Sequence, residues 1–248
     1  MLGAFPISDL FEGEAAMIRT RLPSLRKLRG KNPKFKCVIF DMDGTLTDTN
    51  QLIFDSFNYI AMKYKGKTYL PAEIVSMFGP PEEGALVDVV GEEKIDHAMK
   101  EYLAFYGKNH KELARLHPGI RDLLRFLQKR KVHCALFTGK GIHTTTITMQ
   151  AFALMPFFEY VVTGNDVVNY KPDSEGILKI LDHFSLRKDE VLMVGDSIGD
   201  VKAAREAGVR IAIVLWDRYS KEKVIKLKTN YAFHTVTEFS MWIRDRID

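Results

Sequence analysis

The sequence is poor in cysteine and contains no long hydrophobic run. Its 248 residues include two cysteines, Cys37 and Cys134, and both lie in short apolar runs. Two cysteines cannot make a disulfide framework for a chain of this size, so we expect buried free thiols in a reducing compartment. No apolar run approaches the roughly 20 residues that a membrane-spanning helix needs. We therefore expect no association with a membrane.

Basic residues are absent from the first sixteen positions, which contain the acids Asp9, Glu12 and Glu14. A secretory signal peptide has a different pattern, in which a basic segment precedes an apolar core. We therefore expect a soluble protein that works in the cytoplasm. With 46% hydrophobic residues, the chain also has enough apolar material for a full core, which excludes a disordered protein.

Acids are absent from the next segment, Met17–Lys36, which accounts for the formal net charge of +4. Beyond this segment the chain is close to neutral. We interpret residues 1–35 as an exposed basic arm. An acidic partner, an anionic membrane or RNA could dock on it, but no strong apolar face or RNA-binding module accompanies it, so we expect no nucleic-acid partner. The basic residues of the segment are Arg19, Arg21, Arg26, Lys27, Arg29, Lys31, Lys34 and Lys36.

Short apolar runs recur after the arm and alternate with segments of helical periodicity. Such runs are typical of strands buried on both faces, and their alternation with helices favours a parallel sheet. The sequence therefore predicts a doubly wound, Rossmann-like α/β core with five strands. The predicted strands are Cys37–Phe40, Val132–Phe137, Tyr160–Val162, Val191–Val194 and Ile211–Leu215, and the predicted helices are Ile120–Arg130, Ser174–Phe184 and Val201–Ala207.

The alternation fails between the first strand and the helix at Ile120, where the gap is far longer than an ordinary loop. This stretch has helical periodicity over Gln51–Lys65, Pro71–Met77 and Glu92–Ala114. We predict that residues 49–116 form an α-helical cap on a core made of residues 36–48 and 117–248. An insertion at this point sits over the carboxyl ends of the strands, where such folds bind ligands.

Two carboxylates follow the first strand in the sequence Asp41-Met42-Asp43-Gly44-Thr45. Residues two apart on extended backbone point to the same side, and Gly44 allows a sharp turn just beyond them. Two like charges this close need a cation, a bound proton, or both. The alternative is an Asp-rich turn that caps the next helix, but the five-residue pattern is much rarer by chance than a lone Asp-x-Asp.

Polar residues also follow the other predicted strands. Thr138-Gly139 comes after the second strand and Lys171-Pro172 after the third, while Gly195-Asp196-Ser197 ends the fourth. Asp200 follows closely and is a suitable N-cap for the next helix. Each feature alone could simply be a turn that ends a strand, without a functional role. We expect them to converge because the carboxyl ends of parallel strands lie at one edge of the sheet.

In this order the motifs resemble the four-motif signature of the haloacid-dehalogenase-like phosphohydrolases, over residues 37–216. The helical insertion resembles the subclass with an α-helical cap, which includes phosphoglycolate phosphatases, related pyrophosphatases and β-phosphoglucomutases. Within it, residues 78–83 resemble the substrate-facing loop of the cap. Residues 117–120 are similar to the turn by which the chain returns to the core.

The resemblance implies a role for each motif. Asp41 would attack phosphorus and form an aspartyl-phosphate, while Asp43 would protonate the leaving oxygen and later take a proton from water. Mg²⁺ would be held by the Asp41 side chain, the backbone carbonyl of Asp43 and the Asp196 side chain, with Asp200 orienting its water ligands. The groups expected to hold the phosphoryl oxygens are Thr138, the Gly139 amide and Lys171.

The expected function is a Mg²⁺-dependent phosphatase acting on a small phosphorylated metabolite. A phosphomutase, an inorganic pyrophosphatase and a non-catalytic binding protein on the same fold remain alternatives, and the substrate and the choice between monomer and homodimer stay open. The aromatic residues of region 49–116 are expected to form a core rather than a base-stacking platform. The histidines have no metal-ligand spacing, so no zinc is expected. Lys140 is expected to be a solvated loop lysine.

Overall fold

The computed structural model of the protein describes residues 35–217 and 224–247. The basic arm predicted for residues 1–35 therefore lies outside the described residues, apart from Phe35, which is buried. Within the described ranges, no helix is both long enough and apolar enough to cross a membrane. Both cysteines are free thiols and buried, as the sequence predicted.

A six-stranded sheet forms the centre of the fold, and all of its neighbouring strands run parallel. This confirms the doubly wound α/β core but corrects the number of strands from five to six. The strand that the sequence did not predict is short and lies at the edge of the sheet, where its first two side chains are not buried. In spatial order the strands are β5 (Tyr160–Val162), β4 (His133–Phe137), β1 (Cys37–Phe40), β6 (Val191–Gly195), β7 (Arg210–Val214) and β8 (Tyr231–Phe233).

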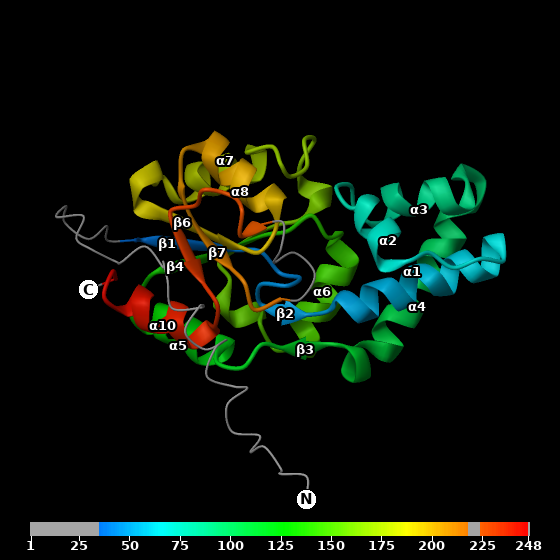
Figure 1. Ribbon diagram of the computed structural model, residues 1–248, viewed down its shortest axis with the longest axis horizontal. Coiled ribbons are helices and arrows are strands. Elements are labelled where there is room, and N and C mark those ends of the chain that lie inside the picture. Colours follow the sequence, from blue (N-terminus) through cyan, green and yellow to red (C-terminus); the bar gives the residue numbers. More distant parts are fainter. Residues whose placement is uncertain (1–34, 218–223, 248) are drawn as a thin grey trace, which may run out of the picture. The chain divides into compact units, whose positions relative to one another are not determined.

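Helices cover both faces of this sheet (Figure 1). Side chains alternate along β1: Val38 and Phe40 join one core cluster, while Cys37 and Ile39 join the other. Because every residue of this strand is buried, its run of apolar residues is continuous rather than alternating with polar ones. The first cluster includes α5 (Ile120–Lys129), α6 (Ile142–Ala151) and α10 (Val236–Arg244), and the second includes α7 (Glu175–Phe184) and α8 (Ile198–Ala207).

Helix α8 begins three residues earlier than the sequence analysis predicted. Its N-cap is Ser197, whose hydroxyl accepts a hydrogen bond from the backbone N–H of Asp200. The carboxylate of Asp200 in turn accepts from the backbone N–H of Ser197, at 2.9 Å. Asp200 is therefore the acidic partner in a capping box and not the N-cap itself. The helix ends at Gly208, which has the left-handed conformation expected of a C-cap.

A second group of helices lies between two short antiparallel strands, β2 (Thr47–Asp48) and β3 (Arg115–Leu116). Helix α3 (Glu82–Val90) was not predicted, since its first residues were interpreted as a loop. The predicted helix over Glu92–Ala114 is divided, because a 3₁₀ turn over Glu92–Lys94 precedes the main helix. The helices are α1 (Asn50–Lys65), α2 (Pro71–Ser76), α3 (Glu82–Val90) and α4 (Ile95–Leu113).

These four helices have a hydrophobic core of their own. Tyr102 and Tyr106 of α4 are fully buried in it, and the rings of Phe57 and Tyr102 meet edge to face with centroids 5.5 Å apart. Most aromatic side chains of this region therefore pack against one another, as the sequence predicted. Phe78 is different, because 45% of its surface is exposed.

We predict that Gly176→Ala destabilises the protein, although alanine is normally the better helix former. A Cβ at this position of α7 would overlap the buried ring of Phe137. Overpacking of a core typically costs about 1–3 kcal/mol, and the overlap with the ring puts this change in the upper part of that range, above the propensity gain of about 1 kcal/mol. The matched control is Gly107→Ala in α4, where a Cβ meets open space, and this change should stabilise the protein. Urea unfolding of both variants measures the difference, and equal effects would contradict this account.

Candidate active site

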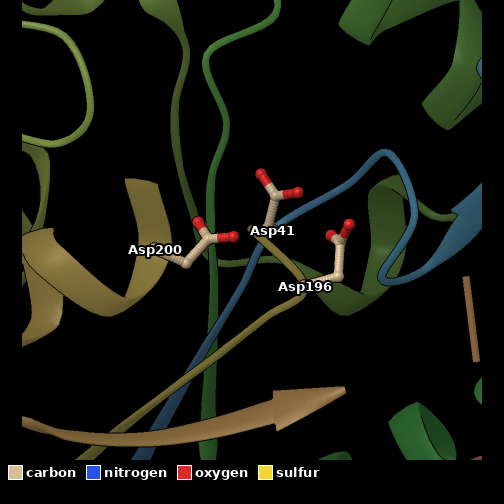
Figure 2. A group of neighbouring side chains, drawn as sticks. All are labelled: Asp41, Asp196 and Asp200. Carbon is tan, nitrogen blue, oxygen red and sulfur yellow. The ribbon is translucent and has the colours of Figure 1, made fainter. Parts of the chain in front are cut away.

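The strand order brings three carboxylates together at the carboxyl edge of the sheet. Asp41 directly follows β1, and Asp196 directly follows the neighbouring strand β6. Asp200 joins them from the first turn of α8. Figure 2 shows the three side chains converging, and each offers an oxygen within 4.8 Å of the others. The sequence analysis predicted this convergence, since all three residues lie at or just beyond the ends of adjacent strands.

Burial makes ionisation of these carboxylates costly. Asp41 is 8% exposed, and desolvation raises its pKa to about 7, against the opposing effect of Lys171. The negative charges of Asp200 and Asp43 contribute to this raised pKa. Desolvation also raises the pKa of Asp196, helped by the nearby charges of Asp41 and Asp200. A positive charge placed among these groups would therefore be strongly stabilised.

Lys171 is the basic group that directly contacts this cluster. Its Nζ donates hydrogen bonds to Asp41 Oδ1 at 2.8 Å, Asp200 Oδ1 at 2.7 Å and the Phe137 carbonyl at 2.6 Å. Burial alone would lower the pKa of this lysine, but the charges of Asp200 and Asp41 outweigh burial and raise it. The ammonium group uses all three donors and is fixed beside Asp41.

Asp200 is completely buried, and its two oxygens have different partners. Oδ1 accepts from Lys171, while Oδ2 accepts from the backbone N–H and the hydroxyl of Ser197, at 2.9 and 2.6 Å. The helix start and the lysine are therefore held by one carboxylate. Its predicted role toward a metal's water ligands stays a prediction.

Gly44 and Thr45 determine where the Asp196 carboxylate lies. The Thr45 hydroxyl donates to Asp196 Oδ1 at 2.9 Å. Gly44 has φ of +82°, and a Cβ there would lie 2.5 Å from Asp196 Oδ2. A side chain at this position is excluded both by the left-handed backbone and by the carboxylate packed against it. The glycine of the first motif thus makes room for the aspartate of the fourth.

Asp43 and Thr138 lie beside the cluster. One carboxylate oxygen of Asp43 accepts a hydrogen bond from the Thr49 hydroxyl, and the other lies 3.3 Å from Lys140 Nζ. Thr138 is buried, and its hydroxyl accepts from the backbone N–H of Lys140 at 3.2 Å. Gly139 lines the same cavity as Asp41 and Asp43. All the predicted site residues therefore border one space or contact a residue that does.

The prediction for Lys140 was wrong, because this lysine is buried and not solvated. Its side chain is only 2% exposed, and its Nζ lies 4.7 Å from the centre of the Tyr106 ring and 3.9 Å from Glu82 Oε1. Both neighbours belong to the helical segment that packs over this loop. Burial would lower the pKa of Lys140, but the charge of Asp43 and other neighbours raise it above its usual range.

Glu82 is a further site residue that the sequence analysis did not identify. It is 8% exposed, and its carboxylate accepts from the backbone N–H of Gly141 at 2.8 Å and from the Thr144 hydroxyl at 2.5 Å. Both donors lie at the start of α6, directly after the Thr138 loop. The only indication in the sequence was that Glu82 lies within residues 78–83, which resemble the substrate-facing loop of the cap.

The donor set fits a divalent metal ion. Asp41 and Asp196 supply carboxylate oxygens close together, and oxygen is the ligand that hard cations prefer. Ionisation of either group is unfavourable without a compensating charge. The chemistry of these residues is therefore consistent with the metal that the sequence motifs imply.

Comparison with known proteins agrees with this geometry. A model of the haloacid dehalogenase-like hydrolases matches residues 38–214. The chain belongs to this family. It is 31% identical to the pyrophosphatase PpaX of Bacillus cereus over 183 residues, which cover 74% of this chain and 84% of that protein. The chain is thus an enzyme of the family rather than an unrelated protein on a similar sheet.

Solved structures show the same fold. A predicted phosphoglycolate phosphatase from Haemophilus somnus matches with a TM-score of 0.72 and 20% identity, covering 85% of this chain and 97% of that one. CbbY from Rhodobacter sphaeroides, in complex with phosphate, matches with a TM-score of 0.73 and 17% identity, covering 83% and 96%. The match extends over the sheet and the helical segment together, because it covers most of each chain.

We predict that Asp200→Ala lowers the free energy of unfolding by about 3 kcal/mol, as expected when one partner of a buried ion pair is removed. The change deletes a charge-assisted bond to Lys171 and the acidic half of the α8 capping box. Urea unfolding measures the effect. The control is Asp182→Ala on the exposed side of α7, which should change stability by less than about 0.5 kcal/mol. Similar losses in the two variants would show that Asp200 has no special structural role.

Proposed function

We propose that this enzyme is a Mg²⁺-dependent phosphatase that hydrolyses a small phosphorylated substrate through an aspartyl-phosphate intermediate. The observation that carries this proposal is the position of Asp41, which lies between Lys171 and Asp196 in a cavity of about 480 Å³. The same cavity is lined by Thr138 and Gly139, which can donate hydrogen bonds to phosphoryl oxygens. Relatives named as a pyrophosphatase and a phosphoglycolate phosphatase support a reaction at phosphorus.

Asp41 and Asp43 divide the reaction between them. A carboxylate oxygen of Asp41 forms a bond to phosphorus as the bond from phosphorus to the leaving oxygen breaks, and Asp43 gives that oxygen a proton. Water then attacks phosphorus, its proton passes to Asp43, and the Asp41–phosphorus bond breaks to release inorganic phosphate. Thr49 and Lys140 orient Asp43 for both transfers through their contacts with its two oxygens.

The side chains of Asp41 and Asp196 and the backbone carbonyl of Asp43 would hold the Mg²⁺ ion. When bound, the ion offsets the negative charge that otherwise opposes attack of a carboxylate on a phosphate dianion. Lys171 adds a second fixed positive charge, which Asp200 keeps in place beside the attacking group. Helices α1–α4 would form the cap that excludes water from this cavity.

Asp41→Asn should lower kcat/KM for phosphate esters at least about a thousandfold, because the amide cannot act as the nucleophile. The experiment measures phosphate release in excess Mg²⁺. The matched control is Asp182→Asn, an equivalent change at an exposed position on α7. Activity of Asp41→Asn close to that of the unchanged protein would contradict the mechanism.

Mg²⁺ affinity should fall as the pH falls below about 7. Because burial raises the pKa of Asp41 to about 7, this carboxyl holds a proton at lower pH, and the ion must displace it. We expect the affinity to drop by about fivefold between pH 7 and pH 6, and by close to tenfold per pH unit further below, because one proton is displaced. Calorimetric titration with Mg²⁺ measures this, with Asp196→Asn as the variant that should bind poorly at either pH. An affinity independent of pH would contradict competition between a proton and the ion at Asp41.

A phosphomutase differs from a phosphatase only in the acceptor of the phosphoryl group. Incubation with a hexose 1-phosphate separates the two reactions, since a mutase yields the 6-phosphate and a phosphatase yields free phosphate. We expect free phosphate and no hexose 6-phosphate, whether hydrolysis of this sugar phosphate is fast or slow.

A further inference from the structure

We propose that the preferred substrate is a phosphate monoester whose leaving alcohol is uncharged and has an apolar face. This inference rests on the proposed phosphatase function and concerns the part of the cavity that receives the leaving group. It differs from what the names of the relatives suggest, because pyrophosphate and phosphoglycolate both have anionic leaving groups.

The part of the cavity wall that helices α1 and α2 and the following loop contribute is mostly apolar. Ile53 and Phe57 of α1 line it together with Val75 of α2 and Phe78 of the following loop. Ile53 and Phe57 are buried, whereas Phe78 and Val75 are 45% and 38% exposed. Apolar surface left uncovered at the wall of a binding cavity gains free energy when a ligand covers it. A ring or hydrocarbon on the leaving alcohol would provide that cover.

Each of the two buried lysines that line the cavity already has carboxylates beside it, which offset its positive charge. Within residues 35–217 and 224–247, the lysines that line the cavity are Lys140, Lys171 and Lys202. Lys140 and Lys171 each lie within 4 Å of two carboxylates. Lys202 is exposed on α8 and therefore surrounded by water. A carboxylate or phosphate on the leaving group would compete with these carboxylates for the same two cations.

Glu82 adds negative charge on the same side as the apolar wall. It lines the cavity from the start of α3, and its hydrogen bonds to Gly141 and Thr144 hold it there in a buried position. An anionic leaving group would approach this carboxylate as well as Asp43. Like charges brought together away from water are strongly unfavourable, so the site would reject such a substrate.

Two esters that differ by one charge test the proposal. Benzyl phosphate and 4-carboxybenzyl phosphate have similar leaving groups, but the second has a carboxylate at the far end of its ring. With Mg²⁺ present, we expect kcat/KM for benzyl phosphate to be at least about tenfold higher. Inorganic pyrophosphate and phosphoglycolate should likewise be poorer substrates than benzyl phosphate.

Two variants assign the preference to particular side chains. Phe78→Ala should reduce the ratio of kcat/KM for benzyl phosphate to that for methyl phosphate by roughly tenfold, mainly through KM. Its matched control is Leu178→Ala on α7, a side chain with a similar exposure of 44% outside the cavity. Glu82→Gln keeps a hydrogen-bond acceptor at the same place, and it should narrow the gap between the two benzyl esters several-fold.

The outcomes distinguish the inference from the proposed function. If the enzyme hydrolyses pyrophosphate, phosphoglycolate or the carboxylated ester as well as benzyl phosphate or better, the substrate class is wrong while the phosphatase function stands. If no phosphate ester is hydrolysed with Mg²⁺, the proposed function is wrong and the inference is wrong with it. A preference for benzyl phosphate that Phe78→Ala removes supports both.

Discussion

Repulsion between buried carboxylates at one edge of the sheet is the constraint on which the site depends. Asp41, Asp196 and Asp200 are within reach of one another in a place where water cannot screen them. Such an arrangement is stable only when positive charge or protons compensate it. The surrounding residues meet part of this requirement: Lys171 bridges two of the carboxylates with its positive charge, and the Thr45 hydroxyl donates a hydrogen bond to the third. The positive charge of a bound metal ion would offset the remaining negative charge. Burial of the carboxylates therefore favours metal binding.

The helical segment contributes to a second, smaller set of charged groups, which lies beside the carboxylate cluster. Its Glu82 accepts hydrogen bonds at the start of α6, and Lys140 lies between this carboxylate and Asp43. Glu82, which we propose disfavours anionic leaving groups, is therefore connected through Lys140 to Asp43, the proposed proton donor.

The main features of the fold and of the carboxylate cluster could be predicted from the sequence because they are local. The apolar run Cys37–Phe40 and the Asp-x-Asp after it lie side by side in the chain, and parallel strands bring their ends to one edge. Lys140 and Glu82 could not be paired in this way, because 58 positions separate them and only packing of the helical segment brings them together. The strand β8 was missed because an edge strand of three residues needs little apolar sequence.

The start of α8 shows a different limit of prediction from the sequence. The sequence predicted Asp200 as the N-cap, and only the backbone geometry shows that Ser197 is the N-cap and Asp200 its partner in the capping box. In this arrangement Oδ2 of Asp200 accepts from Ser197 at the helix start, while Oδ1 accepts from Lys171 in the site.

The central claim, that Asp41 is the nucleophile, is tested most directly by trapping the intermediate. The enzyme is mixed with substrate and Mg²⁺, quenched in acid within milliseconds, and digested for peptide mass spectrometry. The account predicts one added phosphoryl group on the peptide that contains Asp41, absent when the substrate is left out. Rapid turnover with the phosphoryl group on another residue, or with none on the protein, would contradict it.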